Sequence, residues 1–415
     1  MSLKKAISEY IRSGESESQN LGLEIEHFIV DEEGTQIEFH EISELIDQVG
    51  HSLGAEIIYM DGYPVGYYTG EYSTSLEPSC QFEISINPYS DLNEIRSIYE
   101  EFREIWDPIF FERGYHFVTK GNLPNVELGE ITPDDIPLSP KKRYKYMNEY
   151  FEKSGKYGKY MMRASASAQV SVDYRSEEDM VKKLRVLQKI SPIFMIMMEN
   201  KSQEESSLPG VEDKTHLLRT QEWDDLDPDR TGFVPHSLDD DFGYDRMADV
   251  VSHTPLILLT DDGVTIDVGH KSADDLVKEN VFYKNELGEE RKKRLIEHFM
   301  SMGFFHFRVK KYIEIRVADS VSIDKALGYV ALIKGLIYSD DNLNVLDEEL
   351  SEIDSIEAIQ EAVEEIERYG YEAEIYDGLT AYQWAEHLIS LASDELSETD
   401  KEYLENVRAV WSFSK

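Results

Sequence analysis

The 415-residue sequence contains one cysteine, Cys80, so no disulfide can form within the chain. It also lacks a continuous apolar stretch of about 18 residues, the length of a membrane-spanning helix. The first 14 residues predict an amphipathic helix and have neither the apolar core nor the cleavage site of a secretion signal. From these absences we expect a cytoplasmic protein with no membrane partner.

Positive charge is scarce as well, with 42 basic residues against 84 acidic ones and a net charge of −42. A surface of this kind repels nucleic acid, so nucleic acid is not expected as a partner. Solubility or adaptation to a salty cytoplasm would each explain the acidity, and the sequence leaves both open. If such a protein binds an anionic nucleotide, it needs local cations, which draws attention to carboxylate clusters that could hold Mg²⁺.

The signatures of several large enzyme classes are missing from the sequence. It has no GxxxxGK[ST] phosphate loop, no GxGxxG that opens a helix, no HExxH, no CxxC and no GxSxG. The histidines show no metal-ligand spacing either. Any catalytic site is therefore expected among carboxylates and arginines.

Alternation of apolar and polar residues predicts several strands. The predicted strand segments are residues 21–31, 74–88, 165–174 and 309–319. Pro78 interrupts the second segment, which predicts either two strands joined by a turn or one bulged strand.

Helical patterns fill the segments between these strands and after them. Asp91 is placed as the N-cap of one helix, and Ser176 or Glu177 near the start of another. Thr380 and Thr399 are placed as N-caps within the C-terminal part. The polar segment 217–233 predicts a loop. The whole pattern favours an α+β fold with a largely antiparallel sheet over a doubly wound fold.

Polar side chains two residues apart share one face of a strand. Four predicted strands carry such pairs: Glu24 with Glu26, Gln81 with Glu83, Gln169 with Ser171, and Glu314 with Arg316. Carboxylates gathered on one sheet face suit Mg²⁺ bound to phosphates, and an arginine suits bidentate phosphate or carboxylate binding. The alternative is four unrelated solvent-facing strands, since outward polar residues are usual in antiparallel sheets.

Five runs in this order carry a resemblance to a known family. They are GLEIEHFIVD, SLEPSCQFEIS, RASASAQVSVDYRSEEDMVKKLR, RTQEWDDLDPDRTGF and FRVKKYIEIRVAD, and residues 121–150 add an RY…M motif. Over about residues 20–340 the chain resembles the plant-type, or second, family of glutamate–cysteine ligases.

That family is similar to glutamine synthetase in its active-site sheet. The resemblance therefore implies a curved, largely antiparallel sheet that forms a funnel, with helices packed outside. It also implies a single catalytic domain over residues 1–415, with a core at 20–340 and a helical region at 341–415.

The resemblance further implies roles for individual residues. The implied metal ligands are Glu24, Glu26, Glu83, Glu314 and, as a weaker candidate, Glu77. Arg316 and Glu26 would be catalytic, and Arg316 would contact the phosphate or the transferred phosphoryl group. The implied substrate- or nucleotide-binding residues are Gln169, Arg219, Trp223, Arg230 and Cys80.

Departures from the family pattern concern the acceptor pocket. The family's LEPGGQ is LEPSCQ here, so Ser79 and Cys80 replace two glycines. Ser171 replaces an asparagine, and MENKS (198–202) replaces an ANSP-like motif. We expect the bulkier Cys80 to influence which amine fits.

Three functions are compatible with these observations. The first is synthesis of γ-glutamylcysteine from glutamate and cysteine with ATP and Mg²⁺, the opening step of glutathione synthesis. The second is ligation of glutamate to another amine, and the third is a non-catalytic homologue that binds glutamate or nucleotide. The retained carboxylates argue against the third, because their mutual repulsion favours their loss when no metal is bound. The oligomeric state is left open.

Overall fold

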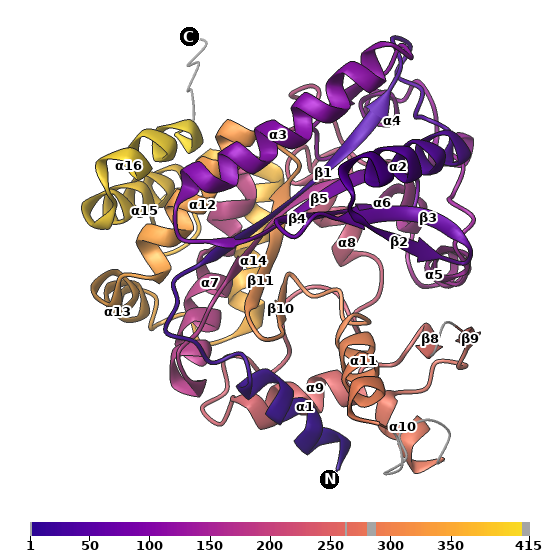
Figure 1. Cartoon of the computed structure of the whole chain (residues 1–415). Coiled ribbons are helices and arrows are strands. Elements are labelled where there is room, and N and C mark those ends of the chain that lie inside the picture. The colour runs from indigo at the N-terminus through magenta and orange to yellow at the C-terminus, as the bar shows by residue number, and fades with distance from the viewer. Residues whose placement is uncertain (1, 262–263, 280–287, 409–415) are drawn as a thin grey trace.

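A computed structural model describes residues 2–261, 264–279 and 288–408, and one large sheet forms its centre (Figure 1). Its strands are β1 (Leu21–Val30), β2 (Glu56–Met60), β3 (Tyr63–Tyr68), β4 (Tyr72–Leu76), β5 (Phe82–Tyr89), β6 (His116–Val118), β7 (Ser167–Val172), β10 (Phe307–Val309) and β11 (Ile313–Asp319). They follow the order β10-β11-β7-β1-β5-β4-β3-β2, with β6 paired to the far end of β1, and the neighbours are antiparallel. The predicted α+β class with an antiparallel sheet is confirmed.

Strand β1 lies between β7 and β5, and its alternation divides the molecule into two faces. Leu23 and Ile25 are fully buried on one face, where they join the main hydrophobic core. Glu24 and Glu26 point to the opposite face, because successive side chains of a strand alternate. The sequence pattern of β1 thus positions both the core and the candidate site.

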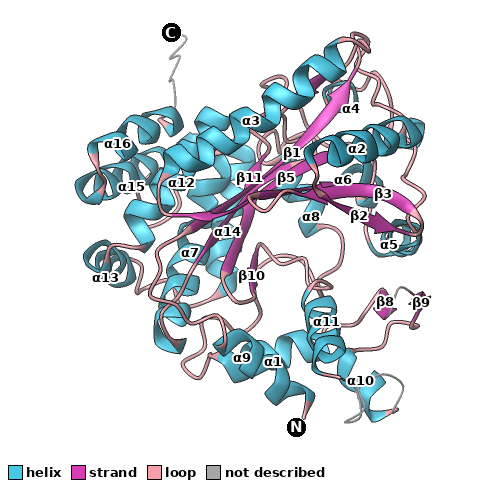
Figure 2. Cartoon of the chain, in the orientation of Figure 1, coloured by secondary structure: helices cyan, strands magenta, loops and turns pink. Residues whose placement is uncertain are grey.

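Helices cover the apolar face of the sheet (Figure 2). They are α2 (Phe39–Leu53), α3 (Leu92–Phe111) and α12 (Ile323–Ile337). Trp106 of α3 packs edge-on against Phe82 of β5 at a centroid distance of 4.8 Å. Asp91 caps α3 by accepting a hydrogen bond from the backbone N–H of Asn93, as predicted.

The segment around Pro78 forms a turn between two strands, β4 and β5, so the two-strand interpretation of 74–88 is correct. Ser176 caps the long helix α7 (Glu177–Met197), also as predicted. Within the segment predicted as a loop, residues 218–224 instead form the short helix α8 (Leu218–Asp224). Its packing against the helix at residues 158–164 supplies what the local sequence does not signal.

The C-terminal helices α13 (Asp340–Glu349), α14 (Ile356–Tyr369), α15 (Ala381–Glu395) and α16 (Glu398–Leu404) pack against α7 and α12. Thr380 caps α15 in a capping box, as predicted. Thr399 was expected to cap the last helix, but Ser397 does so, because its hydroxyl accepts from the Asp400 N–H. The end of that predicted helix, residues 409–415, lies outside the described residues. The single-domain boundary stays a prediction.

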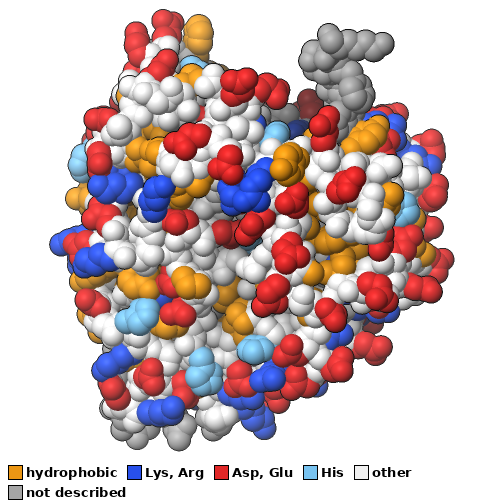
Figure 3. All heavy atoms as spheres, turned by 180° about the vertical axis from the view of Figure 1, so that it is seen from behind, with side chains coloured by type: hydrophobic (Ala, Val, Ile, Leu, Met, Phe, Trp, Pro, Cys, Tyr) orange, Lys and Arg blue, Asp and Glu red, His pale blue; other side chains and the backbone are white. Residues whose placement is uncertain are grey.

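The remaining elements lie on the polar side of the sheet or at its ends. They are α1 (Leu3–Arg12), α4 (Pro124–Glu127), α5 (Lys142–Ser154), α6 (Gly158–Ala164), α9 (Tyr244–His253), the hairpin β8 (Leu258–Asp261) and β9 (Val264–Asp267), α10 (Ala273–Lys278) and α11 (Glu289–Met300). None of the helices in the described ranges is long and apolar enough to cross a bilayer. Acidic side chains are spread over the face shown in Figure 3 rather than gathered into one patch.

Candidate active site

A cavity of about 380 Å³, called here the sheet cavity, opens on the polar face of the sheet. It is lined by residues that come from widely separated parts of the chain. The predicted site residues in its lining are Glu24, Glu26, Glu77, Glu83, Gln169, Arg219, Trp223, Glu314 and Arg316. The polar strand faces therefore converge, and the alternative of four unrelated solvent-facing strands is wrong.

Strand register explains how four carboxylates come together. Glu26 lies directly opposite Glu83 across the β1–β5 pair, and Glu24 lies opposite Gln169 across the β1–β7 pair. Glu77 follows β4, where Ser75 donates hydrogen bonds to both Glu77 (3.3 Å) and Glu83 (3.2 Å). Glu24, Glu26, Glu77 and Glu83 are called the acidic wall.

Burial and mutual repulsion raise the pKa values of three members of this wall, Glu24, Glu26 and Glu83. Burial, followed by the charge of Glu77, raises the pKa of Glu26 to about 7. The pKa of Glu83 lies well above its usual range, through burial and the charges of Glu24, Glu77 and Glu26. Burial and Glu314 likewise raise the pKa of Glu24. Buried carboxylates that repel one another need a positive partner to stay ionised.

Strands β10 and β11 form the opposite end of the cavity, where Arg308, Lys310 and Arg316 make the basic wall. All three surround the buried carboxylate of Glu314: Arg308 binds it closely, Lys310 Nζ at 2.8 Å and Arg316 Nη1 at 3.3 Å. Burial alone would raise the pKa of Glu314, but Arg308, Lys310 and Arg316 hold it well below its usual range. Glu314 is therefore already neutralised by protein cations.

Arg316 is aimed by an irregularity in β11. The β11–β7 register shifts between Ile315 and Ala318, and the Arg316 N–H donates instead to the carbonyl of His306 at 3.0 Å. Arg316 Nη1 also donates to Gln169 Oε1 at 2.5 Å. A bulge that re-aims a side chain beside a site is a recurrent use of this feature.

Helix α8 brings Arg219 and Trp223 over the basic wall. The guanidinium carbons of Arg219 and Arg316 lie 5.8 and 5.9 Å from the Trp223 ring centroid. Arg219 Nε and Trp223 Nε1 are buried and find no acceptor within the described parts of the chain. Since a buried donor is normally paired, these two N–H groups indicate an acceptor supplied by a ligand.

Sequence reasoning missed several residues of the cavity: Lys141, Arg143, Tyr144, Arg308 and Lys310. In the described ranges, Arg143 has no ion pair or side-chain hydrogen bond, unlike the cations of the basic wall. Burial, together with the charge of Arg308, lowers the pKa of Arg143. The signal that could have found Arg143 and Tyr144 was the RY…M motif, which the resemblance named without assigning a role.

Two predicted ligand-binding residues lie elsewhere. Arg230 is fully buried outside the cavity lining and donates to Asp227, Tyr150 and the carbonyls of Pro255 and Met302, so it serves the fold. Cys80 is buried in the β4–β5 turn with a φ of 68° and is also absent from the lining. The structure gives neither residue a place beside a ligand, because turn and core contacts use them.

The acidic wall, rather than Glu314, is suited to a divalent cation. Within the described residues, no group of three or more His, Cys, Asp or Glu side chains is arranged closely enough to hold a metal ion. The donor chemistry nevertheless fits, because Glu24, Glu26 and Glu83 are half-buried carboxylates whose repulsion a cation would relieve. The metal roles stay predictions.

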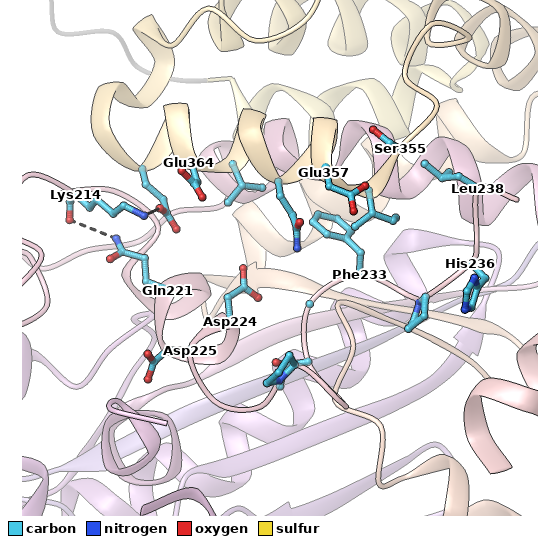
Figure 4. Close-up of a pocket in the computed structure, with 18 of the residues that line it drawn as sticks. Lys214, Gln221, Asp224, Asp225, Phe233, His236, Leu238, Ser355, Glu357 and Glu364 are labelled. Atoms are coloured by element: carbon cyan, nitrogen blue, oxygen red, sulfur yellow. Dashed lines mark hydrogen bonds and ion pairs between the residues drawn. The ribbon is translucent and has the colours of Figure 1, made fainter. Parts of the chain in front are cut away.

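A second cavity, of about 840 Å³, lies between α8 and α14 (Figure 4). Gln221 and Asp224 face it from α8, while Glu357 and Glu364 face it from α14. Arg219 and Trp223, from the same short helix, line the sheet cavity instead. Helix α8 therefore separates the two cavities.

The fold and the opposed charged walls define a site for small charged molecules, as in a carboxylate–amine ligase, and comparison with known proteins identifies the family. The profile of glutamate–cysteine ligase family 2 matches residues 20–409. The chain therefore belongs to this family, and the prediction made from the five sequence runs is confirmed.

Individual relatives agree with this assignment. Glutamate–cysteine ligase B from Oryza sativa subsp. japonica is 27% identical over 356 residues, which cover 84% of this chain and 69% of that protein. Glutamate–cysteine ligase from Brassica juncea is 29% identical over 350 residues, 81% of this chain and 64% of that protein. A solved glutamate–cysteine ligase from Francisella tularensis, in complex with AMP, has a TM-score of 0.52 at 15% identity, and the match covers 95% of this chain and 81% of that one. This structural likeness supports the fold.

The same comparison corrects the predicted location. These plant relatives are named as chloroplastic enzymes, so the prediction of a cytoplasmic protein is wrong. That prediction rested on one cysteine and on a missing secretion signal. Neither observation distinguishes the cytoplasm from another reducing compartment.

Proposed function

We propose that this chain uses ATP to join the side-chain carboxyl of L-glutamate to the amine of L-cysteine, forming γ-glutamylcysteine, the first step of glutathione synthesis. A carboxylate does not react with an amine at neutral pH, because its oxygen is a poor leaving group. Phosphorylation of the glutamate side chain by ATP gives an acyl phosphate and ADP. The amine then attacks the acyl carbon, and phosphate leaves.

The observation that carries this proposal is the pairing of an acidic wall with a basic wall across one cavity. Phosphoryl transfer requires positioning and charge neutralisation rather than a nucleophilic side chain. The basic wall and the two unpaired donors of α8 supply sites for phosphate and carboxylate oxygens. The family relatives named as glutamate–cysteine ligases support the same substrates.

The acidic wall supports a requirement for Mg²⁺. Glu24, Glu26, Glu83 and Glu77 would hold the ion, and Mg²⁺ bound there supplies positive charge to the phosphates of ATP. Glu314 contributes differently from the role first assigned to it, because it orients Arg308, Lys310 and Arg316.

The arginines around the cavity have separate roles in this proposal. Arg316, fixed by Gln169 and Glu314, faces the transferred phosphoryl group, where its fixed guanidinium geometry suits two oxygens. Arg143, which has no ion pair among the described residues, binds a substrate carboxylate or phosphate. Arg219 and Trp223 form the cover over these groups.

The test is ADP release by the purified chain with ATP, Mg²⁺ and L-glutamate, with single amino acids and amines as acceptors and identification of the product by mass. We expect cysteine-dependent release together with the mass of γ-glutamylcysteine. Omission of glutamate or addition of excess chelator should stop release. Release with another amine alone would assign a different acceptor, and absence of release across the panel would contradict a ligase.

A further inference from the structure

The wall between the two cavities contains a close contact between a histidine and a carboxylate that neither motif nor family pattern predicted. His306 lies just before β10 and is buried, with 6% of its surface exposed. Its Nε2 atom lies 3.1 Å from Oδ1 of Asp224, the last residue of α8. The geometry is not that of a hydrogen bond, and Nε2 has no hydrogen-bond partner among the described residues. Asp224 also lines the second cavity, where Figure 4 shows it on the α8 side.

Both members of this pair are directly connected to residues of the candidate active site. Asp224 follows Trp223 in the chain, and the His306 carbonyl accepts the Arg316 N–H at the bulge of β11 (3.0 Å). His306, Arg219, Trp223 and Arg316 also line one small cleft of about 10 Å³. The contact between Asp224 and His306 therefore links the end of α8 to the strand that carries Arg316.

Other contacts fix the imidazole, and α8 is also anchored elsewhere, since Glu222 accepts from Asn122 and Gln221 Nε2 donates to the His216 carbonyl at 2.7 Å. The His306 ring packs on Phe233 with a centroid distance of 4.9 Å, and its backbone N–H donates to the Gly232 carbonyl at 2.8 Å. Across the same gap, Arg219 Nη1 donates weakly to the Arg316 carbonyl at 3.3 Å. A helix of only seven residues has little stability of its own, so such tertiary contacts decide its orientation.

We propose that Asp224 and His306 are positioning residues that hold Trp223 of α8 against Arg316 and so set the geometry of the cover over the phosphoryl-transfer site. This inference rests on the proposed function, because it assigns work to Arg316 and Trp223. Neither Asp224 nor His306 lines the sheet cavity, and neither touches the reacting groups.

The experiment compares variants that separate polar contact from packing. H306F keeps a ring against Phe233 but removes the Nε2 atom, H306Q keeps a polar side chain without the ring, and D224A removes the carboxylate. A matched control is H236F, which removes an exposed pair of the same chemistry, His236 with Asp239 at 3.0 Å, at the rim of the second cavity. We expect kcat to fall about tenfold in H306F and D224A, because each loses a contact to a charged group.

H306Q should retain kcat within about threefold of wild type, and H236F should match wild type. The double variant D224A/H306F should be no slower than either single variant, since residues that act as one unit are not additive. Melting temperature is measured alongside. The proposal would be overturned if kcat fell as much in H306Q as in H306F and the melting temperature fell in parallel. Packing alone would then explain the role of His306.

A second readout does not depend on turnover. Acrylamide quenching of tryptophan fluorescence is measured for each protein and for the same protein carrying W223F. The difference between the two gives the quenching of Trp223, apart from the signal of the buried Trp106 and Trp384 and of any other tryptophan. We expect increased quenching of Trp223 in H306F and D224A, and wild-type quenching in H306Q and H236F. If wild type makes no γ-glutamylcysteine, the proposed function fails while this assay still tests the pair. Wild-type quenching in both H306F and D224A would overturn the positioning role.

Discussion

The two walls of the sheet cavity hold like charges in opposite ways. The basic wall carries its own counter-charge, because Arg308, Lys310 and Arg316 converge on Glu314. In the described ranges no ion pair joins Glu24, Glu26 or Glu83 to a cation. Burial with mutual repulsion raises their pKa values, although Arg316 acts in the opposite sense on Glu24 and Glu26. One wall is neutralised within the protein, whereas in the proposed function a bound cation neutralises the other.

This difference separates preorganisation from binding. A preformed guanidinium array needs no rearrangement when negative charge arrives, which is how a protein stabilises phosphoryl transfer electrostatically. An unneutralised carboxylate set destabilises the free protein and becomes favourable only when a cation binds. Ligand binding to the folded state alone then appears as added stability.

The largest expected effect is on stability when the basic wall loses its counter-charge. Glu314→Gln leaves Arg308, Lys310 and Arg316 buried without a carboxylate. Removing one partner of a buried ion pair costs about 3–5 kcal/mol, so we expect a decrease of this size in the free energy of unfolding, measured by urea titration. An unchanged unfolding free energy would show that the three cations do not depend on Glu314.

The next effect is on catalysis. Arg316→Lys keeps the charge but removes the bidentate fork that Gln169 and Glu314 orient. We expect kcat to fall about 10²–10³-fold, as when one transition-state donor is removed. The control is Arg113→Lys, an exposed arginine on the far side of the sheet, and single-turnover ADP release gives the measurement. Equal rates for the two variants would remove Arg316 from the site.

The third effect is on stability as a function of pH, and it arises in the acidic wall. Because the folded pKa of Glu26 is about 7 against an ordinary value of 4.5, folding favours the protonated form. The associated stability is present below the unfolded pKa and is lost as pH rises through the folded pKa. With chelator present, we therefore expect the free energy of unfolding to decrease by on the order of 2 kcal/mol between about pH 5 and about pH 8. The melting temperature should fall over the same pH range.

Glu26→Gln should flatten that pH dependence, raise stability in chelator near pH 8 and abolish turnover. Added Mg²⁺ should stabilise wild type at high pH and have little effect on the variant. If the melting temperature of wild type were independent of both pH and Mg²⁺, the acidic wall would not be a cation site. Melting curves at several pH values, with and without Mg²⁺, decide between these outcomes.

The smallest effect is expected in the turn between β4 and β5, beside the acidic wall. Cys80 has a positive φ that glycine adopts without strain, but its buried side chain packs in the core. Strain relief and lost packing oppose each other, so Cys80→Gly should change the unfolding free energy by less than about 1 kcal/mol. Because Cys80 is absent from the cavity lining, the KM values for acceptors should stay at wild type. A shifted acceptor preference would restore the role first predicted for it.

The sequence predicted the acidic wall better than the basic one. Alternation fixes which side chains share a strand face, so Glu24 and Glu26 could be paired before the structure was known. Arg308 and Lys310 lie only a few residues before Glu314, but their contact with it depends on the β10–β11 hairpin register. Helix α8 and the Asp224–His306 pair depend on tertiary packing between segments about 80 residues apart, which local propensity does not encode.

The alternation of β1 also constrains how this protein can change. A shift of one residue in β1 would turn Glu24 and Glu26 into the core and Leu23 and Ile25 into the cavity, because strand side chains have a period of two. A register error made during folding would thus be penalised on both faces at once, and so would a single-residue insertion within the strand. Point substitutions in β1 change one face of the strand at a time. A change in its length would disturb the apolar core face and the carboxylate face together.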